Sequence, residues 1–370
     1  MGRHNGVRRV ALSLTAAAVL LVPLACGTGG GAGDSVNEAG ELVIDGELVA
    51  DAALMEAALA EGSVTVYSGV PESIEATMQE EFTAATGIDV VNVRLPSGQL
   101  YERILTEHGS GVLEADVVHV SDLSFVEDFR ESGISRPYEV AAWDKIPEQY
   151  RQDEGHYYAM IIGMMGFAYN TELVPAEEAP RTWADLLDPK WTNEIAMHHA
   201  GAGGSSWSWA LFQRQAFGEE YWQQLAAQRP ALYPSTAAIT EELVRGEVSI
   251  AVNHIGTVNQ RQEEGAPVAS IYPDDGVTVF PFYTVQTEGS SSPAAADVLQ
   301  NWTMSTAGAR ALDTASGEYH PNVDAVPPTV LDEQQPPITD LDLIVADEQD
   351  WVGLRDEWVS EWNRIYGYTG

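Results

Sequence analysis

A chain of 370 residues with 45% hydrophobic and 9% aromatic residues is long enough for two packed lobes and too apolar for a disordered protein. Its 18 basic and 56 acidic residues give a formal net charge of −38, which argues against nucleic acid or an anionic membrane surface as partners. Because the acidic residues are spread along the chain, we expect a solvating surface suited to high salt.

The first 25 residues have the anatomy of an export signal. Arg3, Arg8 and Arg9 precede an apolar run over residues 10–22, which is too short to span a bilayer comfortably. We therefore predict a signal peptide over residues 1–25. Its removal takes away three arginines and no acids, so 15 basic residues remain against 56 acidic ones, a formal charge of −41.

Cys26 follows this signal and is the only cysteine of the sequence, so no internal disulfide is possible. The segment Pro23-Leu-Ala-Cys26 resembles a lipoprotein cleavage box, in which the cysteine is acylated. The alternative is simple secretion with an inert cysteine. We predict lipidation of Cys26, followed by a Gly-rich flexible tether over residues 26–45.

Helix-like and strand-like segments alternate through the first half of the chain. The patterns predict helices over residues 51–61, 74–85, 100–105 and 122–131, and strands over residues 64–67, 88–93 and 115–120. Leu54, Ala58 and Leu59 are expected on the inner face of the first helix, and Gly62 ends it. Such an alternation implies a mostly parallel sheet with helices on both faces.

A second set of units follows. The patterns predict strands over residues 158–169, 195–197, 247–252 and 277–285, a capped short helix over 182–187, and helices over 207–217, 239–245 and 294–304. Pro281 indicates a sheet edge or a bulge. Near the C-terminus, apolar residues at spacings of three and four predict a helix packed on the body: Trp351, Leu354, Trp358, Trp362 and Ile365.

Small, hydroxyl or amide residues recur at turns after predicted strands. Ligands of open α/β sheets bind at such turns, where helix N-termini and backbone N–H groups are exposed. Five turns fit this description: Ser68-Gly69, Ser97-Gly98-Gln99, Gly203-Gly204-Ser205, Ser235-Thr236 and Asn253-His254. Their recurrence in both halves of the chain predicts a binding site between two lobes.

Two histidine positions raise the question of a metal. His198 and His199 are adjacent on a predicted strand and point to opposite faces, which favours a structural pair over a metal site. His254 ends a strand at an expected lobe crossing, where ligand contact and a structural hydrogen bond both stay open. The sequence has no nucleophile elbow, P-loop, helical histidine pair or reactive cysteine. We predict no enzyme activity, no metal and no cofactor.

Several motifs together resemble ferric-type extracellular solute-binding proteins of ABC importers. The most specific is Pro180-Arg-Thr-Trp-Ala-Asp-Leu-Leu-Asp-Pro-Lys-Trp191. Supporting segments lie at residues 63–69, 82–90, 114–117, 168–170, 246–248 and 316–323, so the resemblance covers about residues 50 to 328. It implies a type II periplasmic-binding-protein fold: two α/β lobes, each a mostly parallel sheet flanked by helices, joined by a two-strand hinge. Lobe 1 would hold residues 46–158 and 270–320, and lobe 2 residues 159–269 and 321–370.

The iron ligands of that family have no counterpart in this sequence. Ferric-binding members carry a tandem tyrosine after the strand that follows Gly-Glu-Val, whereas residues 251–257 here contain no tyrosine. The family's histidine ligand falls near Pro71 and its acidic ligand near Gly98. Tyr157-Tyr158 starts a strand and is expected to pack. Direct Fe(III) binding is therefore disfavoured, and iron complexed with an anion stays as an alternative.

The positions with which the family holds an anion are better matched. We expect a small organic anion or zwitterion, such as a phosphonate or phosphate ester, with its anionic head at the helix N-terminus over residues 203–205. Asp122 or Glu72 would pair with an amino group of the ligand. The predicted ligand-binding residues are Ser68, Ser97, Gln99, Asp122, Gly203, Gly204, Ser205, Thr236, Asn253 and His254.

Signal, architecture and motifs together predict a monomeric, lipid-anchored solute-binding protein on the extracytoplasmic side of the cell membrane. It would deliver its small-molecule ligand to an ABC transporter permease and contact the membrane through the lipid anchor alone. A lipid-anchored sensor that reports its ligand to a membrane receptor is the main rival. An extracellular enzyme on the same scaffold lacks a supporting catalytic constellation.

Overall fold

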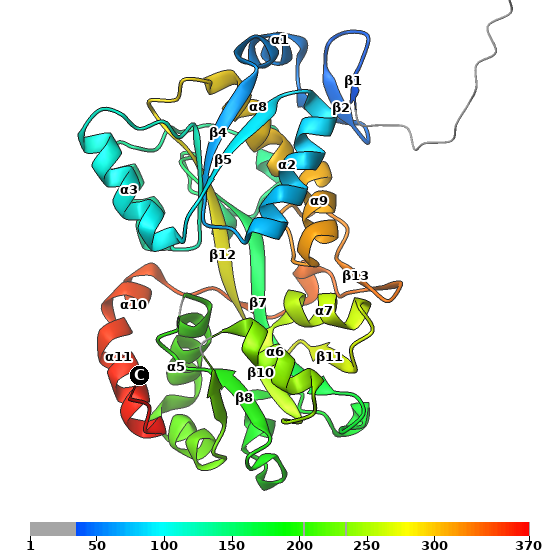
Figure 1. Ribbon diagram of the computed structural model, residues 1–370, viewed down its shortest axis with the longest axis vertical. Helices are drawn as coiled ribbons and strands as arrows, with labels where there is room; N and C mark the ends of the chain where they lie inside the picture. The colour runs from blue at the N-terminus through cyan, green and yellow to red at the C-terminus, as the bar shows by residue number, and fades with distance from the viewer. Residues whose placement is uncertain (1–34, 203, 234, 370) are drawn as a thin grey trace, which may run out of the picture. The chain divides into compact units, whose positions relative to one another are not determined.

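A mixed sheet of ten strands runs through the described part of the chain, residues 35–202, 204–233 and 235–369 of a computed structural model. The predicted signal peptide, Cys26 and Gly203 lie outside the described residues. Residues 33–370 belong to one compact unit. Its architecture is the predicted α/β fold with two lobes and a pair of connecting strands (Figure 1).

The first lobe is built from units in which each strand is followed by a helix. Its parallel strands are β4 (Ser63–Ser68), β5 (Asp89–Arg94) and β6 (Val117–Val120), and its helices are α1 (Ala52–Glu61), α2 (Glu72–Thr86), α3 (Ser97–Gly109) and α4 (Leu123–Glu131). This order confirms the prediction. Gly62 ends α1 at a left-handed φ of 81°, which glycine adopts without steric cost. Leu59 is 46% exposed and was wrongly predicted to face inward, because the buried face of α1 centres on Met55 and Ala58.

The second lobe combines both strand directions. Its strands are β7 (Tyr158–Asn170), β8 (Ile195–His198), β9 (Ala231–Tyr233), β10 (Ile250–His254) and β11 (Val268–Ile271), and its helices are α5 (Gly204–Ala227), α6 (Thr236–Val244) and α7 (Ile255–Glu263). β8 runs parallel to β9 and β10, whereas β7 is antiparallel to β10 and β11. The predicted capping box is present, since Thr182 and Asp185 cap each other's backbone.

Two long antiparallel strands, β7 and β12 (Val277–Gln286), run through both lobes (Figure 1). In the first lobe, residues Tyr283–Gln286 of β12 pair with β6. In the second lobe, residues Met165–Tyr169 of β7 pair with β10. Every residue of β7 is buried, as expected for a strand covered on both faces. These two strands form the predicted hinge.

Pro281 lies in the middle of β12, between β6 and β7, and not on a strand at the edge of the sheet. The interruption that Pro281 indicated is present as a register shift between Phe282 and Tyr283. On its other side, β12 pairs with β15 (Leu343–Ile344) only at residues 277–278 and with β6 only from Tyr283 onward. Residues 279–282 of β12 therefore have no partner among the described strands on the side opposite β7, and a proline, which lacks an N–H, is tolerated at position 281. The strand order is β5-β4-β6-β12-β7-β10-β8-β9, with β11 on β7 and β15 on β12.

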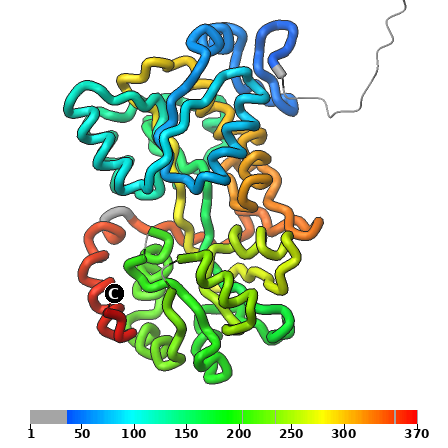
Figure 2. The backbone as a smooth tube through the Cα atoms, in the orientation of Figure 1, coloured from blue at the N-terminus to red at the C-terminus, as the bar shows by residue number. Residues whose placement is uncertain are grey.

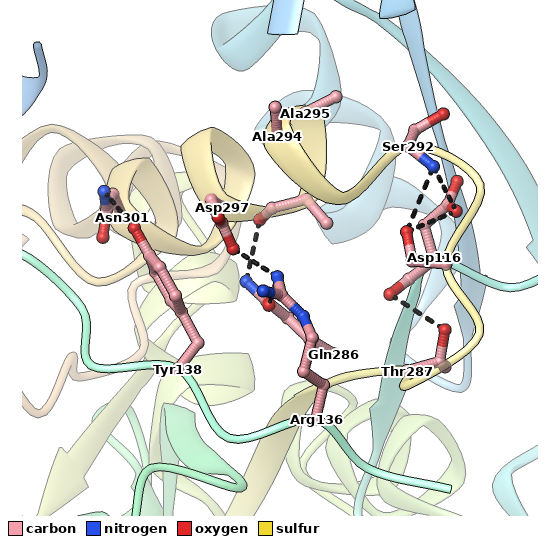
Figure 3. Close-up of polar contacts among 12 residues, drawn as sticks. Asp116, Arg136, Tyr138, Gln286, Thr287, Ser292, Ala294, Ala295, Asp297 and Asn301 are labelled. Atoms are coloured by element: carbon pink, nitrogen blue, oxygen red, sulfur yellow. Dashed lines mark hydrogen bonds and ion pairs between the residues drawn. The ribbon is translucent and has the colours of Figure 1, made fainter. Parts of the chain in front are cut away.

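A late part of the sequence completes the first lobe through buried polar contacts (Figure 3). α8 (Pro293–Thr303) packs on α1, and α9 (Thr306–Ser316), which the sequence analysis did not predict, packs on α2. The Asp116 carboxylate accepts hydrogen bonds from Ser291 N at 2.8 Å and Ser292 N at 3.1 Å. Arg136 bonds both Gln286 and Asp297. The end of β12 and the start of α8 are thereby fixed to strand β6.

The folded part begins earlier than predicted. Two short strands, β1 (Ser35–Val36) and β2 (Leu42–Ile44), occupy residues that we assigned to the tether, and β3 (Glu47–Ala50) follows directly after it. The three strands are antiparallel. Leu42 and Ile44 are completely buried in the core of the first lobe. The prediction of a flexible tether up to residue 45 was wrong over residues 35–45, because this apolar alternation outweighs the Gly-rich composition before it.

The C-terminal segment packs on the second lobe, as predicted for its apolar stripe. α10 (Glu348–Gly353) and α11 (Arg355–Tyr366) lie beside α5 (Figure 2). Trp351 and Trp362 are buried in the core of this lobe. A two-stranded ribbon of β13 (Thr329–Val330) and β14 (Glu333–Gln334) precedes it. None of the helices in the described ranges is long and apolar enough to cross a membrane.

Candidate functional site

The first lobe presents a pair of serines at the carboxyl ends of its parallel strands. Ser97 opens α3 after β5, and Ser121 follows β6. Their hydroxyl oxygens lie 3.3 Å apart, and Ser121 N donates to Ser97 Oγ at 3.3 Å. Gly69 approaches Ser97 so closely that a Cβ at position 69 would lie 2.3 Å from Ser97 Oγ. Short side chains therefore let these turns approach one another closely, and the role of Ser97 in ligand binding stays a prediction.

Ser68 does not take part in this pair. It is fully buried, donates to Glu75 Oε2 at 2.6 Å and accepts from Val70 N at 3.1 Å. His119 Nδ1 lies 3.2 Å from the same Glu75 oxygen. Burial opposes the charge on Glu75, yet His119, Ser68 and Gln79 together hold its pKa below the ordinary value. The last β4 side chain thus points toward α2, away from the serine pair, and the predicted ligand contact of Ser68 stays a prediction.

Gln99 and Asp122 lie at the amino ends of two helices in the first lobe. Gln99 is exposed in the first turn of α3. Asp122 caps α4, its Oδ1 accepting from Ser124 N at 3.0 Å and from Ser124 Oγ at 2.7 Å. The other carboxylate oxygen, Oδ2, lies 3.9 Å from an Arg355 nitrogen. One half of the Asp122 carboxylate is therefore structural, and the other half makes only a loose ion pair.

The second lobe places two hydroxyl–imidazole pairs next to each other. Ser205, in the first turn of α5, lies 2.9 Å from His254 Nε2. Thr236, in the first turn of α6, lies 3.3 Å from His198 Nε2. The two imidazole centroids are 5.9 Å apart, and the His254 ring also lies 4.3 Å from the Phe280 ring of hinge strand β12. Three of the predicted residues, Ser205, Thr236 and His254, are thus brought together.

Asn253 is buried beside the His254–Ser205 pair and fixes the end of strand β10. It is 1% exposed, donates to Thr240 Oγ1 at 2.8 Å and accepts from His254 N at 3.0 Å. These bonds fix the end of β10 to α6. Consecutive strand residues point to opposite faces, so His254 faces Ser205 and Asn253 does not. The predicted ligand contact of Asn253 stays a prediction.

Both imidazoles are neutral over the physiological pH range. Burial, followed by the charge of His198, lowers the pKa of His254 to about 3, and burial, followed by His199, lowers the pKa of His198 to about 4. A neutral imidazole offers one donor and one acceptor. The hydroxyls of Ser205 and Thr236 are therefore oriented by uncharged partners.

The two lobes meet at the amino end of α5. A Cβ added at Gly204 would lie 3.7 Å from the Ser121 carbonyl oxygen of the first lobe and 3.6 Å from the ring of Trp351. The contact between Gly204 and Ser121 therefore has polar side chains on both sides. Ser97 and Ser121 belong to the first lobe, and Ser205 and His254 belong to the second. Gly203, which we also predicted here, lies outside the described residues.

An apolar pocket adjoins this contact at the hinge. Four of its lining residues come from β12 and three from the C-terminal segment. The full lining is Ser121, Leu123, Val279, Phe280, Pro281, Tyr283, Val345, Ala346 and Trp351. Four residues near this contact were not among those predicted for the site: Ser121, Phe280, Trp351 and Arg355. Ser121 carried a usable signal, since it follows a buried strand in the manner of Ser68. The aromatic residues gave none, because their spacing equally predicts core packing.

Within the described ranges, no group of three or more His, Cys, Asp or Glu side chains could hold a metal ion. His199 points away from His198 and stacks on Tyr368 with ring centroids 4.4 Å apart. Tyr158 is fully buried, and its hydroxyl donates to the Tyr138 carbonyl at 2.5 Å. Both positions have the structural roles that the sequence predicted.

Comparison with known proteins places these features in context. The family model of the bacterial extracellular solute-binding proteins matches residues 114–346. A relative from Salmonella paratyphi A, named "Putative 2-aminoethylphosphonate-binding periplasmic protein", is 27% identical over 223 residues, which cover 58% of this chain and 63% of the relative. The match thus spans less than two thirds of the length of that relative.

Two solved structures have similar folds. Iron-bound HitA from Pseudomonas aeruginosa superposes with a TM-score of 0.67 at 19% identity, covering 82% of this chain and 99% of HitA. The periplasmic binding protein AfuA from Actinobacillus pleuropneumoniae, with fructose-6-phosphate bound, gives a TM-score of 0.64 at 21% identity and covers 83% and 99%. At these identities the likeness establishes the two-lobe fold.

Proposed function

Because the chain belongs to the bacterial extracellular solute-binding proteins of ABC importers, we propose that it captures a small organic anion or zwitterion between its lobes and delivers it to the permease. Phosphonates and phosphate esters are the ligand classes that fit best. The role is transport and not catalysis. The similar proteins named for an aminoethylphosphonate and a sugar phosphate motivate this choice of class.

The approach of Gly204 to Ser121 is the observation that carries the proposal. The first backbone N–H groups of a helix have no partner within the helix, and the helix dipole favours negative charge there. At α5 these groups lie beside Ser205, and the contact with Ser121 brings the Ser97–Ser121 pair to the same place. An anion held there would accept hydrogen bonds from both lobes.

A positive charge near the serine pair supports an anionic ligand. Arg94 ends β5 and donates through Nε to the Val70 carbonyl at 3.3 Å. This partner is neutral, so the contact does not cancel the guanidinium charge. In a chain with 56 acidic residues, an arginine at the carboxyl edge of the sheet creates a local field opposite to that of the surrounding surface.

Contacts from both lobes also explain how binding would be transmitted. A ligand that touches both lobes binds the closed arrangement more tightly, and so increases its population. The hinge strands β7 and β12 allow such a rotation without breaking either lobe's core. A permease would then recognise the closed arrangement of the lobe surfaces.

Gly204 provides the test of this proposal. We expect Gly204→Leu to weaken binding of the best phosphonate or phosphate ester at least about 100-fold, because its side chain would separate α5 from Ser121 and Trp351. Affinity would be measured by calorimetry on the full-length chain in high salt. The ligand panel would hold 2-aminoethylphosphonate, fructose 6-phosphate, phosphate, Fe(III)-citrate, a polyamine and a neutral sugar.

Gly204→Ala is the matched control, because its Cβ would make only ordinary van der Waals contacts at 3.6 and 3.7 Å. It should bind within a few-fold of wild type. Unchanged affinity in Gly204→Leu would contradict the anion site at α5. If Fe(III)-citrate, the polyamine or the neutral sugar were the only ligand that binds, the proposed class of organic anions or zwitterions would be overturned.

We further propose that Cys26 carries a lipid anchor and that the lobes divide at residues 46–158 with 270–320 and 159–269 with 321–370. The Cys26 anchor rests on the sequence motif that ends the signal peptide. Packing of α8 on α1 and of α11 on α5 supports the division. Mass spectrometry of the mature N-terminus would test the anchor: a diacylated Cys26 supports it, and an unmodified N-terminus contradicts it.

A further inference from the structure

We propose that the C-terminal helices α10 and α11 form part of the ligand site, with Arg355 as the residue that binds the anionic head and Asp122 as its exchangeable counter-ion. The inference rests on the proposed function and specifies the charges of the ligand. It assigns a binding role to a segment whose spacing alone predicted only core packing.

Trp351 places this segment at the junction of the lobes. Its carbonyl accepts from Trp207 Nε1 at 2.9 Å, which fixes α10 on α5. Its ring reaches within 3.6 Å of the Cβ position of Gly204 and lines the apolar pocket together with Ser121 and Phe280. The indole is 8% exposed and therefore forms a fixed wall next to the amino end of α5.

Arg355 is the first residue of α11, four positions after Trp351, and reaches back to the first lobe. Its guanidinium is 3.9 Å from Asp122 Oδ2, a separation that permits charge attraction without a hydrogen bond. The Arg355 side chain is 35% exposed and the Asp122 side chain 15%. Because Oδ1 of Asp122 is already bonded to Ser124, only the weakly paired Oδ2 is available for exchange.

Two other arginines lie on or next to α11, and neither contacts the first lobe. Arg214 of α5 bonds Glu361 of α11 at 3.1 Å, and Arg364 lies within 4.0 Å of the same carboxylate with 71% of its side chain exposed. Both contacts tie α11 to the second lobe or to itself. Arg355 alone among these three arginines faces a residue of the first lobe.

These contacts define the ligand by its charges. An anionic head at the amino end of α5 would take the Arg355 guanidinium away from Asp122 through charge-assisted hydrogen bonds. The released Asp122 oxygen would then favour an ammonium group on the same ligand. A zwitterion satisfies both groups, whereas a simple anion leaves the Asp122 carboxylate unpaired.

The test compares two probes, 2-aminoethylphosphonate and ethylphosphonate, which differ by one amino group. On the full-length chain, Arg355→Ala should weaken both probes at least about tenfold, as expected for the loss of one charge-assisted hydrogen bond. Asp122→Asn should weaken 2-aminoethylphosphonate by a similar factor and leave ethylphosphonate unchanged or tighter. Asn still accepts from Ser124 N, so the α4 cap is kept.

Arg364→Ala is the matched control, since it removes the same charge from the same helix away from Asp122. It should change neither affinity more than about twofold. Equal affinities in wild type and Arg355→Ala would overturn the inference while the proposed function stands. Wild type that binds no member of the wider anion panel would overturn both. If Arg355→Ala and Arg364→Ala weakened the affinity equally, the effect would be one of net charge. That result would overturn the specific role of Arg355.

Discussion

Replacing Glu318 with glutamine is expected to stabilise the protein by about 3 to 4 kcal/mol more near pH 9 than near pH 5, because a buried carboxylate is removed. Glu318 follows α9 and is 9% exposed. It packs against Gly256 of α7, where a Cβ would come within 2.6 Å of its Oε1. Burial raises the pKa of Glu318 to about 8, although a hydrogen bond with the Met164 backbone opposes this.

The sign follows from proton binding. Between the ordinary pKa of 4.5 and the folded value of about 8, the folded chain holds one proton that the unfolded chain has lost. Wild-type stability therefore falls as the pH rises through this window, and is unaffected by this group below it. A glutamine side chain stays neutral throughout and can still accept from Met164 N. The difference between the two proteins isolates this group from all others.

Urea unfolding of both proteins at several pH values would measure this difference. Glu288→Gln serves as the control for the loss of a carboxylate, since Glu288 is exposed and its substitution should change the free energy of unfolding by no more than about 0.5 kcal/mol. A constant difference between Glu318→Gln and wild type from pH 5 to 9 would show that the carboxyl is ionised in the folded state.

Gly163→Ala is expected to destabilise the protein by about 2 to 3 kcal/mol and to weaken ligand binding, because it overpacks the hinge. Gly163 of β7 pairs with Phe280 of β12. A Cβ at Gly163 would lie 2.2 Å from Phe280 Cε2 and 2.4 Å from Cζ. The ring must therefore move, and its displacement would disturb the His254 ring, whose centroid lies 4.3 Å away.

A double-mutant cycle tests this explanation. In a Phe280→Ala background, Gly163→Ala should cost less than about 1 kcal/mol, since the clashing ring is gone. Gly289→Ala is the control for the loss of glycine, because no atom lies within 4 Å of its Cβ position. Equal costs with and without Phe280 would place the effect in the β7 backbone instead of the ring.

Local patterns were sufficient to predict most elements of both lobes. Glycines at helix ends, such as Gly87 with a φ of 77°, have a conformational preference that the sequence states directly. The capping box at Thr182 is equally local. α9 was missed because its buried face consists mostly of small residues, with Leu312 as its one large apolar side chain. β1 to β3 were missed because strands of two to four residues carry too few alternations.

The candidate site was predictable only as a set of turns. Turn position singled out Ser97, Ser205, Thr236 and His254, whose role in ligand binding stays a prediction. It could not give the direction of a side chain. Ser68 and Asn253 point inward because Glu75 and Thr240 offer buried partners there. Trp351 and Arg355 reach the junction only through tertiary packing of α10 on α5. No local pattern contains that information.

The passage of the chain through the first lobe has a consequence for folding. The strands of the second lobe lie within residues 158–271, whereas the first lobe also needs β12 and α8, which come more than 150 residues after its own β6. Bonds such as Asp116 to Ser292 and Glu61 to Ala295 close loops of 176 and 234 residues. Contacts so distant in sequence form slowly, because the entropy cost of closing the loop comes before the contact stabilises the chain. We expect the strands of the second lobe to pair first, and the sheet of the first lobe to be completed only after β12 and α8 have been added. Trp351 and Trp362 complete the core of the second lobe last.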